Sequence, residues 1–423
     1  MATAEAMVPG EVAAGRVRAG GFTFVMAWRN LWRNRRRTWL TAGGIAFASL
    51  LVTMSMALQE GSYQAMISSA TDFYLGQAQI NHRDFENEEK LEQTVIGATQ
   101  LRRDIEAIGG VTVAPRAQSF ALASVGERSF GAAVVGVDFA AEARVVSFFE
   151  RITKGAIPLA SDEVMVGEVM ARNLGAGIGD ELVLLGTAKE GGIGALALTI
   201  SGLYNSGRVE FDRSLVFTHL ATVQNGFDLG DEVHALVLRF DDEQTMQTAM
   251  PKIQKVLPNE EVLRPWQELL PEVVQGIELD RVSAVLFYGG ILVLVTFSVV
   301  NTFIMIVFER TREFGMLLAL GTKPGIIMRQ VQTEALMMWM LGTLIGLVLS
   351  NVIVGWAATT GIPLGAMEEI AQQYYMPSRL YPKITMYSLF LAPVVLLVGT
   401  QLAALIVTLR IRKLRPVTAL RAE

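Results

Sequence analysis

The feature that most constrains this chain is the placement of four long stretches without any Asp, Glu, Lys or Arg. They run from Thr38 to Gln59, from Val282 to Phe308, from Ala335 to Met367 and from Ile384 to Leu409. Each is at least as long as the roughly 20 apolar residues that a helix needs to cross the hydrocarbon core of a bilayer. The residues between the first and second stretch are mostly polar. The sequence therefore predicts an α-helical membrane protein with four transmembrane helices and one large extracytoplasmic domain.

The nearest charged residues and the prolines set the predicted span limits. The transmembrane segments are expected at residues 38–60, 282–308, 325–358 and 384–409. The third span should leave the membrane before Pro363, so residues 359–383 form an outer connection. Pro393 predicts a kink in the fourth span, since neighbouring helices can satisfy the carbonyl that a proline frees.

Basic residues predict the orientation of the spans. They cluster before the first span, between the second and third, and after the fourth: Arg29, Arg33, Arg35, Arg36 and Arg37; Arg310, Arg312, Lys323 and Arg329; Arg410, Arg412, Lys413 and Arg415. Because cytoplasmic loops carry an excess of Lys and Arg, we expect residues 1–37, 309–324 and 410–423 in the cytoplasm and residues 61–281 outside. The N-terminus is not predicted to be a signal peptide, since no small-residue cleavage site follows the first apolar run.

Residues 61–281 are predicted to fold as an α+β domain with two similar halves. In each half a strand, a helix with apolar residues at helical spacing and a second strand follow one another. The halves span about residues 76–125 and 233–265, and a β-rich insertion at about 126–232 separates them. We expect the two halves to form one split α+β module.

The chain lacks the signals of an ATPase or a thiol enzyme. It has no cysteine, which excludes a thiol nucleophile and disulfides, and no G-x-x-x-x-G-K-[ST] motif. The run Gly175-Ala-Gly177-Ile-Gly179 follows a predicted helix instead of opening one, which favours a tight turn over a phosphate loop. We therefore expect no catalytic residue and no cofactor bound by this chain, with ATP and Mg held by a partner ATPase.

Metal, ion and nucleic-acid sites are not predicted either. His82, His219 and His234 lie far apart, and none has a second histidine at helical spacing. Apart from Glu60 at the outer end of the first span, Glu334 near the cytoplasmic entrance of the third span is the one acidic residue within the predicted spans, which disfavours an ion-coupled transporter. The net charge of −5 gives no support to nucleic-acid binding.

Two short segments flank the spans on the predicted cytoplasmic side. Residues 309–324 have charged residues first, then an apolar face at Phe314, Leu317 and Leu320, and they predict a short amphipathic helix. A simple loop anchored by positive charge explains this pattern equally well. Before the first span, Phe24, Trp28, Leu31 and Trp32 share one helical face, which suits either an interfacial helix or a plain topological anchor.

Glu309-Arg-Thr-Arg-Glu313 followed by Leu317-Leu-Ala-Leu-Gly321 resembles the cytoplasmic connection of the FtsX-like and MacB-like ABC transporter permeases, which include the lipoprotein-releasing LolC and LolE type. Other stretches are similar to the same family: Ala27–Thr38, Val164–Val183, Asp212–Gln224 and Arg415–Arg421. The resemblance extends over almost the whole chain, and the order of one span, a large domain and three spans is typical of the family.

The resemblance implies an assembly of two permeases and two ATPase subunits in the bacterial inner membrane, with a MacB-type periplasmic core domain. The second permease would be another copy or a paralogue. The connection would be the coupling helix that contacts the ATPase, a role implied by position for Glu309, Arg310, Arg312, Glu313, Met316 and Gly321. Such a type VII transporter works by mechanotransmission, in which the ATPase cycle moves the periplasmic domains.

The leading functional hypothesis is extraction of a lipoprotein or another hydrophobic cargo from the outer leaflet and its transfer to a periplasmic carrier. Two apolar stripes, in contact with membrane lipids or packed in the bundle, are the candidates for lining a cargo chamber: Phe47, Leu51, Met54 and Leu58; Val293, Phe297, Val300 and Ile304. Alternatives are a MacB-like efflux permease that uses an adaptor, and a non-transporting FtsX-like regulator of a periplasmic enzyme.

Overall fold

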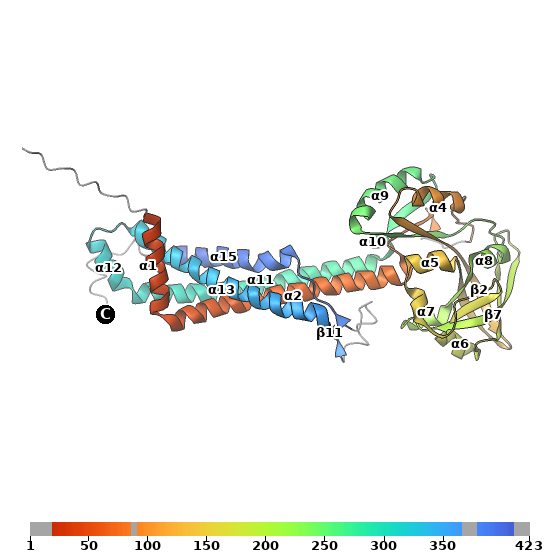
Figure 1. Ribbon diagram of the computed structural model, residues 1–423, viewed down its shortest axis with the longest axis horizontal. Coiled ribbons are helices and arrows are strands. Elements are labelled where there is room, and N and C mark those ends of the chain that lie inside the picture. Colours follow the sequence, from red (N-terminus) through yellow and green to blue (C-terminus); the bar gives the residue numbers. More distant parts are fainter. Residues whose placement is uncertain (1–18, 86–90, 366–378, 410–423) are drawn as a thin grey trace, which may run out of the picture. The chain divides into compact units, whose positions relative to one another are not determined.

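The computed structural model describes residues 19–85, 91–365 and 379–409 (Figure 1). The predicted cytoplasmic tail 410–423 and the extreme N-terminus lie outside the described residues. The described chain divides into two compact units. A helical unit holds the residues up to Gly61, Asp280–Gly361 and those from Tyr381 on, and an α+β unit holds Ser62–Leu279 and Ile362–Leu380.

Six helices make up most of the helical unit: α1 (Ala19–Arg33), α2 (Arg35–Ala70), α11 (Pro271–Glu309), α12 (Thr311–Ala319), α13 (Pro324–Thr360) and α15 (Met386–Leu409). Four of them are long and apolar enough to cross a membrane, namely α2, α11, α13 and α15. Two of these helices are longer than the predicted spans, since α2 continues to Ala70 and α11 begins at Pro271. Pro324 opens α13, as suits a residue without an N–H at the first helical position.

The long helices pack side by side, and α1 runs across them at one end (Figure 1). Small residues allow α2 and α13 to approach closely. A Cβ atom at Gly342 would lie 2.6 Å from the carbonyl oxygen of Ala42, and one at Gly346 would lie 2.6 Å from that of Ala46. Glycines at this four-residue spacing let two helix backbones touch, as is common within membranes.

Another contact joins α13 to α15 near the predicted kink. Trp339 Nε1 donates a hydrogen bond of 2.9 Å to the carbonyl oxygen of Pro393, which lies inside α15. Buried side chains from α11, α12, α13 and α15, such as Phe303, Phe314, Val331 and Leu396, form one core. The bundle is thus held by apolar packing with a few polar contacts.

The α+β unit is built on one ten-stranded sheet system. Its strands are β1 (Ala78–His82), β2 (Val111–Val125), β3 (Arg128–Val137), β4 (Ile152–Gly155), β5 (Glu163–Gly167), β6 (Glu181–Thr187), β7 (Ile193–Tyr204), β8 (Leu215–His219), β9 (Ala235–Phe240) and β10 (Glu261–Pro265). The short elements between and around them are η1 (Thr71–Leu75), α4 (Ala98–Glu106), α5 (Phe139–Val145), η2 (Phe148–Arg151), α6 (Glu168–Leu174), α7 (Val209–Ser214), α8 (Leu220–Gly226), α9 (Glu243–Val256) and α10 (Trp266–Leu269). A two-stranded hairpin of β11 (Ile362–Pro363) and β12 (Arg379–Leu380) also falls in this unit.

One part of the sheet has the order β10-β1-β9-β2, with all neighbours antiparallel. It joins the two strand-helix-strand halves, because β1 of the first half lies between β9 and β10 of the second. Apolar residues of α4 and α9, including Ile105 and Ile253, pack with Ile80 and Leu236 of this sheet in one cluster. This arrangement is a split α+β module.

Six strands, β2 among them, close into a ring, and β4 pairs with β7 outside it. The pairings run β2-β3-β8-β5-β7, and β6 pairs with both β7 and β2. Side chains from all six strands share one buried cluster, which includes Val134, Val164, Leu184 and Ile200. Strand β2 belongs to both parts of the unit, since it pairs with β9 in its first part and with β3 and β6 in its second. The insertion predicted at about 126–232 begins directly after this strand.

Candidate functional site

The candidate site lies at the joint between α11 and α12, where the chain leaves one long helix and starts a short one. Arg310 occupies this joint with φ −99° and ψ 11°, outside helical geometry. Its side chain turns inward and is 8% exposed. The guanidinium lies 5.0 Å from the ring centroid of Phe314, which is fully buried. Arg310 is therefore part of the packed interior and not of the surface.

Glu334 of α13 is the main partner of Arg310. Arg310 Nη1 donates to both carboxylate oxygens of Glu334, at 3.0 and 3.1 Å. Asn30 of α1 donates from Nδ2 to Glu334 Oε1 at 2.7 Å. Glu334 is 3% exposed, so its charge would be unfavourable without these donors. Three elements distant in the sequence thus meet at one carboxylate.

Three further ion pairs lie at the same joint, toward its exposed side. Arg310 Nε donates to Glu313 Oε2 at 2.9 Å, and Arg33 Nη2 donates to Glu313 Oε1 at 2.8 Å. Arg37 of α2 pairs with Glu309 at the end of α11. We call these residues the joint network: Asn30, Arg33, Arg37, Glu309, Arg310, Glu313 and Glu334.

Within the joint network, the pKa values of Arg310 and Glu313 are shifted in the directions that favour their charged forms. Burial acts to lower the pKa of Arg310, but the carboxylates of Glu334 and Glu313 outweigh it and raise that pKa. Burial acts to raise the pKa of Glu313, but Arg310 and Arg33 outweigh it and lower that pKa. Both groups therefore stay ionised near neutral pH, which suits a rigid brace and not a proton relay.

The six residues assigned to coupling by position fall into two groups. Glu309, Arg310 and Glu313 hold partners within the joint network. Arg312, Met316 and Gly321 are exposed. Their role in contacting the ATPase stays a prediction.

The three residues of the predicted apolar face differ in their exposure. Phe314 is buried and Leu317 packs against the core, but Leu320 is 82% exposed. Helix α12 ends at Ala319, although the Leu320 N–H still donates to the Met316 carbonyl at 3.0 Å, and Gly321 then turns the chain with φ +87°. Met316 and Leu320 therefore form the apolar part of an exposed surface.

The face predicted on α1 is also divided. Leu31 is 2% exposed and Trp32 packs against the core, whereas Phe24 and Trp28 are about half exposed. The rings of Trp28 and Trp32 meet edge to face at 5.7 Å between centroids. One side of α1 braces the bundle, and the other presents aromatic rings.

The two predicted chamber stripes do not lie uniformly at the surface. Phe47, Val293 and Phe297 are 62%, 69% and 74% exposed. The remaining five are only partly exposed, and Val300 and Ile304 pack against the core of the bundle: Leu51, Met54, Leu58, Val300 and Ile304. The three exposed residues are thus the ones available to lipid, cargo or a second chain.

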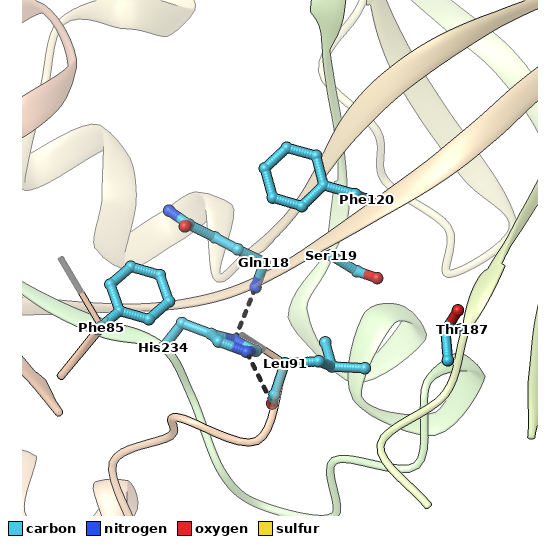
Figure 2. Close-up of a pocket in the computed structure, with 7 residues that line it drawn as sticks. All are labelled: Phe85, Leu91, Gln118, Ser119, Phe120, Thr187 and His234. Carbon is cyan, nitrogen blue, oxygen red and sulfur yellow. Dashed lines mark hydrogen bonds between the residues drawn. The ribbon is translucent and has the colours of Figure 1, made fainter. Parts of the chain in front are cut away.

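The α+β unit has no cluster suited to a metal ion among its described residues. The nearest feature to a polar site is a cavity of about 160 Å³, lined by Phe85, Leu91, Gln118, Ser119, Phe120, Thr187 and His234 (Figure 2). His234 Nδ1 accepts from the Gln118 N–H at 3.0 Å, and Nε2 donates to the Leu91 carbonyl at 3.2 Å. Burial lowers the pKa of His234 to about 4. With both ring nitrogens occupied, it is a structural histidine.

The glycine run in this unit forms a turn. Gly175 ends α6 with φ +71° and Gly179 has φ +92°, and the Gly177 N–H donates to Asp180 Oδ2 at 2.8 Å. The run precedes a strand, so its backbone does not open a helix toward a phosphate.

The sequence alone missed most of the joint network. In the sequence, Arg33 and Arg37 indicate only the orientation of the first span, and no contact is predicted for Asn30. Glu334 carried the usable signal, because a lone carboxylate at the end of an apolar stretch needs a partner.

Two protein families match different parts of the chain. Residues 38–256, more than half of the chain, match the MacB-like periplasmic core domain. Residues 285–416 match the FtsX-like permease C-terminal region. The second match contains Arg310, Glu313 and Glu334.

Relatives of two kinds are similar to this chain. The lipoprotein-releasing system transmembrane protein LolC of Neisseria meningitidis is 24% identical over 405 residues, which cover 91% of this chain and 94% of that protein. LolC of Xylella fastidiosa is 23% identical over 251 residues, which cover 57% of this chain and 60% of that protein. The pyoverdine export ATP-binding/permease protein PvdT of Pseudomonas entomophila is 25% identical over 78% of this chain but only 51% of its own length.

Among solved structures, the periplasmic region of MacB from Actinobacillus actinomycetemcomitans aligns with a TM-score of 0.36 and 11% identity. The alignment covers 48% of this chain and 94% of that one. The extracellular domain of the ABC-type transporter YknZ from Gram-positive bacteria aligns with a TM-score of 0.31 and 8% identity, covering 44% and 97%.

Proposed function

We infer the function of this chain from its family, since it belongs to the ABC transporter permeases that join a MacB-like periplasmic core domain to an FtsX-like C-terminal region. Within that family, we propose that it extracts a lipoprotein, or another cargo with acyl chains, from the outer leaflet of the bacterial inner membrane.

The observation that carries the proposal is the extent of the similarity to LolC. That protein, named for lipoprotein release, aligns over nearly its whole length and that of this chain. PvdT, named for pyoverdine export, shares only half of its own length with this chain. A permease of this kind works with a separate ATPase, which we propose to be present in two copies beside a second permease copy or paralogue. The released cargo would pass to a periplasmic carrier.

We propose that α12 transmits the ATPase cycle to the long helices. Arg312 and Met316 of α12, with Leu320 directly after it, supply a charge and an apolar surface for the ATPase. Arg310, directly before α12, points inward and is tied to α13 through Glu334. A buried charge-assisted pair with two hydrogen bonds resists bending more than a single exposed contact does, so a push on α12 reaches α13 as a displacement of a rigid element.

The cargo chains would contact the exposed apolar side of α2 and α11. Phe47, Val293 and Phe297 offer large side chains without polar atoms. Acyl chains bind such surfaces without directional contacts, so the site would select for hydrophobic anchors and not for a protein sequence.

A crosslinking experiment tests this proposal. The photoreactive amino acid p-benzoylphenylalanine would replace Phe297 in the permease–ATPase complex, in membranes that contain a radiolabelled triacylated lipoprotein. We expect ATP-sensitive crosslinks to the lipoprotein. Trp356 of α13, which is 68% exposed, is the matched control position. Equal labelling at both positions, or labelling of bulk phospholipid alone, would refute the assignment.

Export in the manner of PvdT is the second candidate, because that similarity extends over 78% of this chain. It predicts that pyoverdine, and not the lipoprotein, stimulates ATP hydrolysis in the same complex. If the chain instead relays motion to a periplasmic enzyme, neither of these two cargoes should stimulate ATP hydrolysis.

A further inference from the structure

The residues that follow α2 form an unusual anchor within the α+β unit. Thr71–Leu75 is a π-helix, η1, and Gly76 ends it with φ +73°. Single π-turns are rare and need support from their surroundings. The last turns of α2, from Ser62 on, belong to the same unit as η1 and the sheet.

Aromatic rings hold η1 from one side. The Phe73 ring lies 5.1 Å from that of Phe148, and the Tyr74 ring lies 5.6 Å from that of Phe211 and 6.1 Å from that of Phe217. The partners come from η2, α7 and β8. Edge-to-face contacts of this kind fix ring orientation as well as position.

Arg116 of β2 holds η1 from the other side. Its Nη2 donates to the Tyr74 carbonyl at 2.5 Å, and its guanidinium lies 4.1 Å from the centroid of the Tyr74 ring. Its Nε donates to Glu142 of α5 at 2.8 Å. Arg116 and Glu142 are each 1% exposed. One guanidinium therefore joins η1, the sheet and α5.

Other elements occupy the carbonyl groups of η1. The Asp72 carbonyl accepts from the Ser147 N–H at 2.7 Å and from its hydroxyl at 3.1 Å. The Leu75 carbonyl accepts from Gln79 Nε2 at 2.8 Å. Every residue from Asp72 to Leu75 thus has a ring contact or a hydrogen bond to a neighbouring element, which fixes η1 against the sheet.

The start of α11 is attached differently. The chain leaves β10 through the four-residue helix α10, which has no buried residue. Leu270 then breaks the helix with φ −130° and ψ 61° before Pro271 begins α11. The first turns of α11 are packed through apolar side chains instead, since Val273 and Ile277 are buried.

Stability alone is a weak explanation for the Arg116–Glu142 pair. Desolvation of two charges offsets their attraction, and apolar residues of similar volume often serve equally well. Glu142 Oε2 is buried and has no hydrogen-bond partner among the described residues. An apolar pair could not donate a hydrogen bond to the Tyr74 carbonyl or place a cation over the Tyr74 ring.

We propose that Arg116 and Glu142 are positioning residues that fasten η1, and with it the last turns of α2, to the sheet of the α+β unit. The last turns of α2, from Ser62 on, and the sheet then move as one body. This inference rests on the proposed function in one respect, that movement of the spans is what drives cargo release.

The first experiment measures the anchor without any transport. Since the chain has no cysteine, spin labels can be attached at S68C on α2 and R103C on α4, both exposed positions of the α+β unit. In the full-length permease–ATPase complex we expect a narrow distance distribution that ATP does not shift. The double variant Arg116→Met with Glu142→Met should broaden it clearly.

Lys189 and Glu232 provide the matched control, since they form an ion pair in the same unit. Lys189→Met with Glu232→Met should leave the distribution narrow. Arg116→Lys keeps the charge but loses the planar fork, and it should give an intermediate width even if the double variant fails to fold. A narrow distribution in both Arg116 variants would overturn the proposal.

The second experiment measures lipoprotein released per ATP hydrolysed in proteoliposomes. The double methionine variant should lose this ratio by roughly fivefold, a typical effect of a coupling residue, with its melting temperature and its ATPase rate unchanged. An unchanged ratio would overturn the positioning role. If the wild type releases no lipoprotein, the proposed function fails, while the distance measurement still decides on the anchor.

Discussion

Arg310 and Glu334 are joined by two hydrogen bonds although 24 residues separate them. The pair links the joint between α11 and α12 to the first part of α13, in a place where neither charge meets solvent. It gives the connection on which the proposed coupling depends a fixed orientation.

Removing one partner of this pair should be strongly destabilising. Glu334→Gln leaves the buried Arg310 guanidinium without its main counter-ion, and we expect a loss of about 3 kcal/mol in unfolding free energy. Thermal unfolding of the purified protein in detergent measures the change. Arg33→Met removes a pair whose side chains are 56% and 41% exposed, so it should cost less than about 1 kcal/mol. Equal losses of unfolding free energy in the two variants would show that the buried pair stabilises the protein no more than the exposed pair does.

The exposed side of α12 should matter for coupling and not for stability. Arg312→Ala with Met316→Ala removes a charge and an apolar side chain that the bundle does not bury. We expect an unchanged melting temperature and a roughly tenfold weaker affinity for the ATPase, equivalent to about 1.4 kcal/mol. Arg329→Ala, at an exposed position of α13, is the control. Normal affinity and normal ATPase stimulation in the double variant would exclude this surface as the contact.

Close packing of α2 and α13 should make Gly346 intolerant of a methyl group. Gly346→Ala places a Cβ atom 2.6 Å from the Ala46 carbonyl oxygen, so the helices must separate, at about 1–3 kcal/mol. Gly355→Ala on the same helix meets nothing within 4 Å and should be neutral or slightly stabilising. The melting temperatures of the two variants check this. A neutral Gly346→Ala would mean that the two helices are not in close contact.

The protein should become less stable as the pH is lowered, because of His234. Its pKa is lowered from 6.5 to about 4 in the folded state, so the unfolded state binds the proton more readily. The stability that neutral His234 contributes is therefore complete above about pH 6.5 and lost as the pH falls to about 4, by at most about 3 kcal/mol.

Denaturant unfolding at several pH values measures this dependence. His234→Gln should flatten the curve between pH 6.5 and 4. His82→Gln, at a partly exposed position, should retain the wild-type slope. A wild-type slope in His234→Gln would contradict the assignment.

The four long helices and the α+β character of the intervening domain were predictable because their signals are local. Uncharged stretches from Thr38 and Val282 needed only a comparison of length with bilayer thickness. The strand-helix-strand order around residues 76–125 followed from periodicity. The structure adds the extension of α2 to Ala70, which the charged Glu60 concealed.

The ring of strands had no local signal. β2 meets β6 between Ala121 and Gly186, and no sequence pattern specifies which of several distant strands a strand will choose. The joint network was hidden for a related reason. Glu334 needed a basic partner, and the sequence offers candidate arginines both before α2 and after α11. Only the structure shows that Arg310 is its ion-pair partner.

The position of β1 has a consequence for the order of events during synthesis. β1 pairs only with β9 and β10 among the described strands, and these follow much later in the chain. Strand β1 must therefore remain unpaired until the insertion has been synthesised. Pairing at long sequence separation is slow in any case. A ribosome stalled before Ala235 should display a protease-sensitive segment at Ala78–His82, and one stalled beyond Pro265 should not.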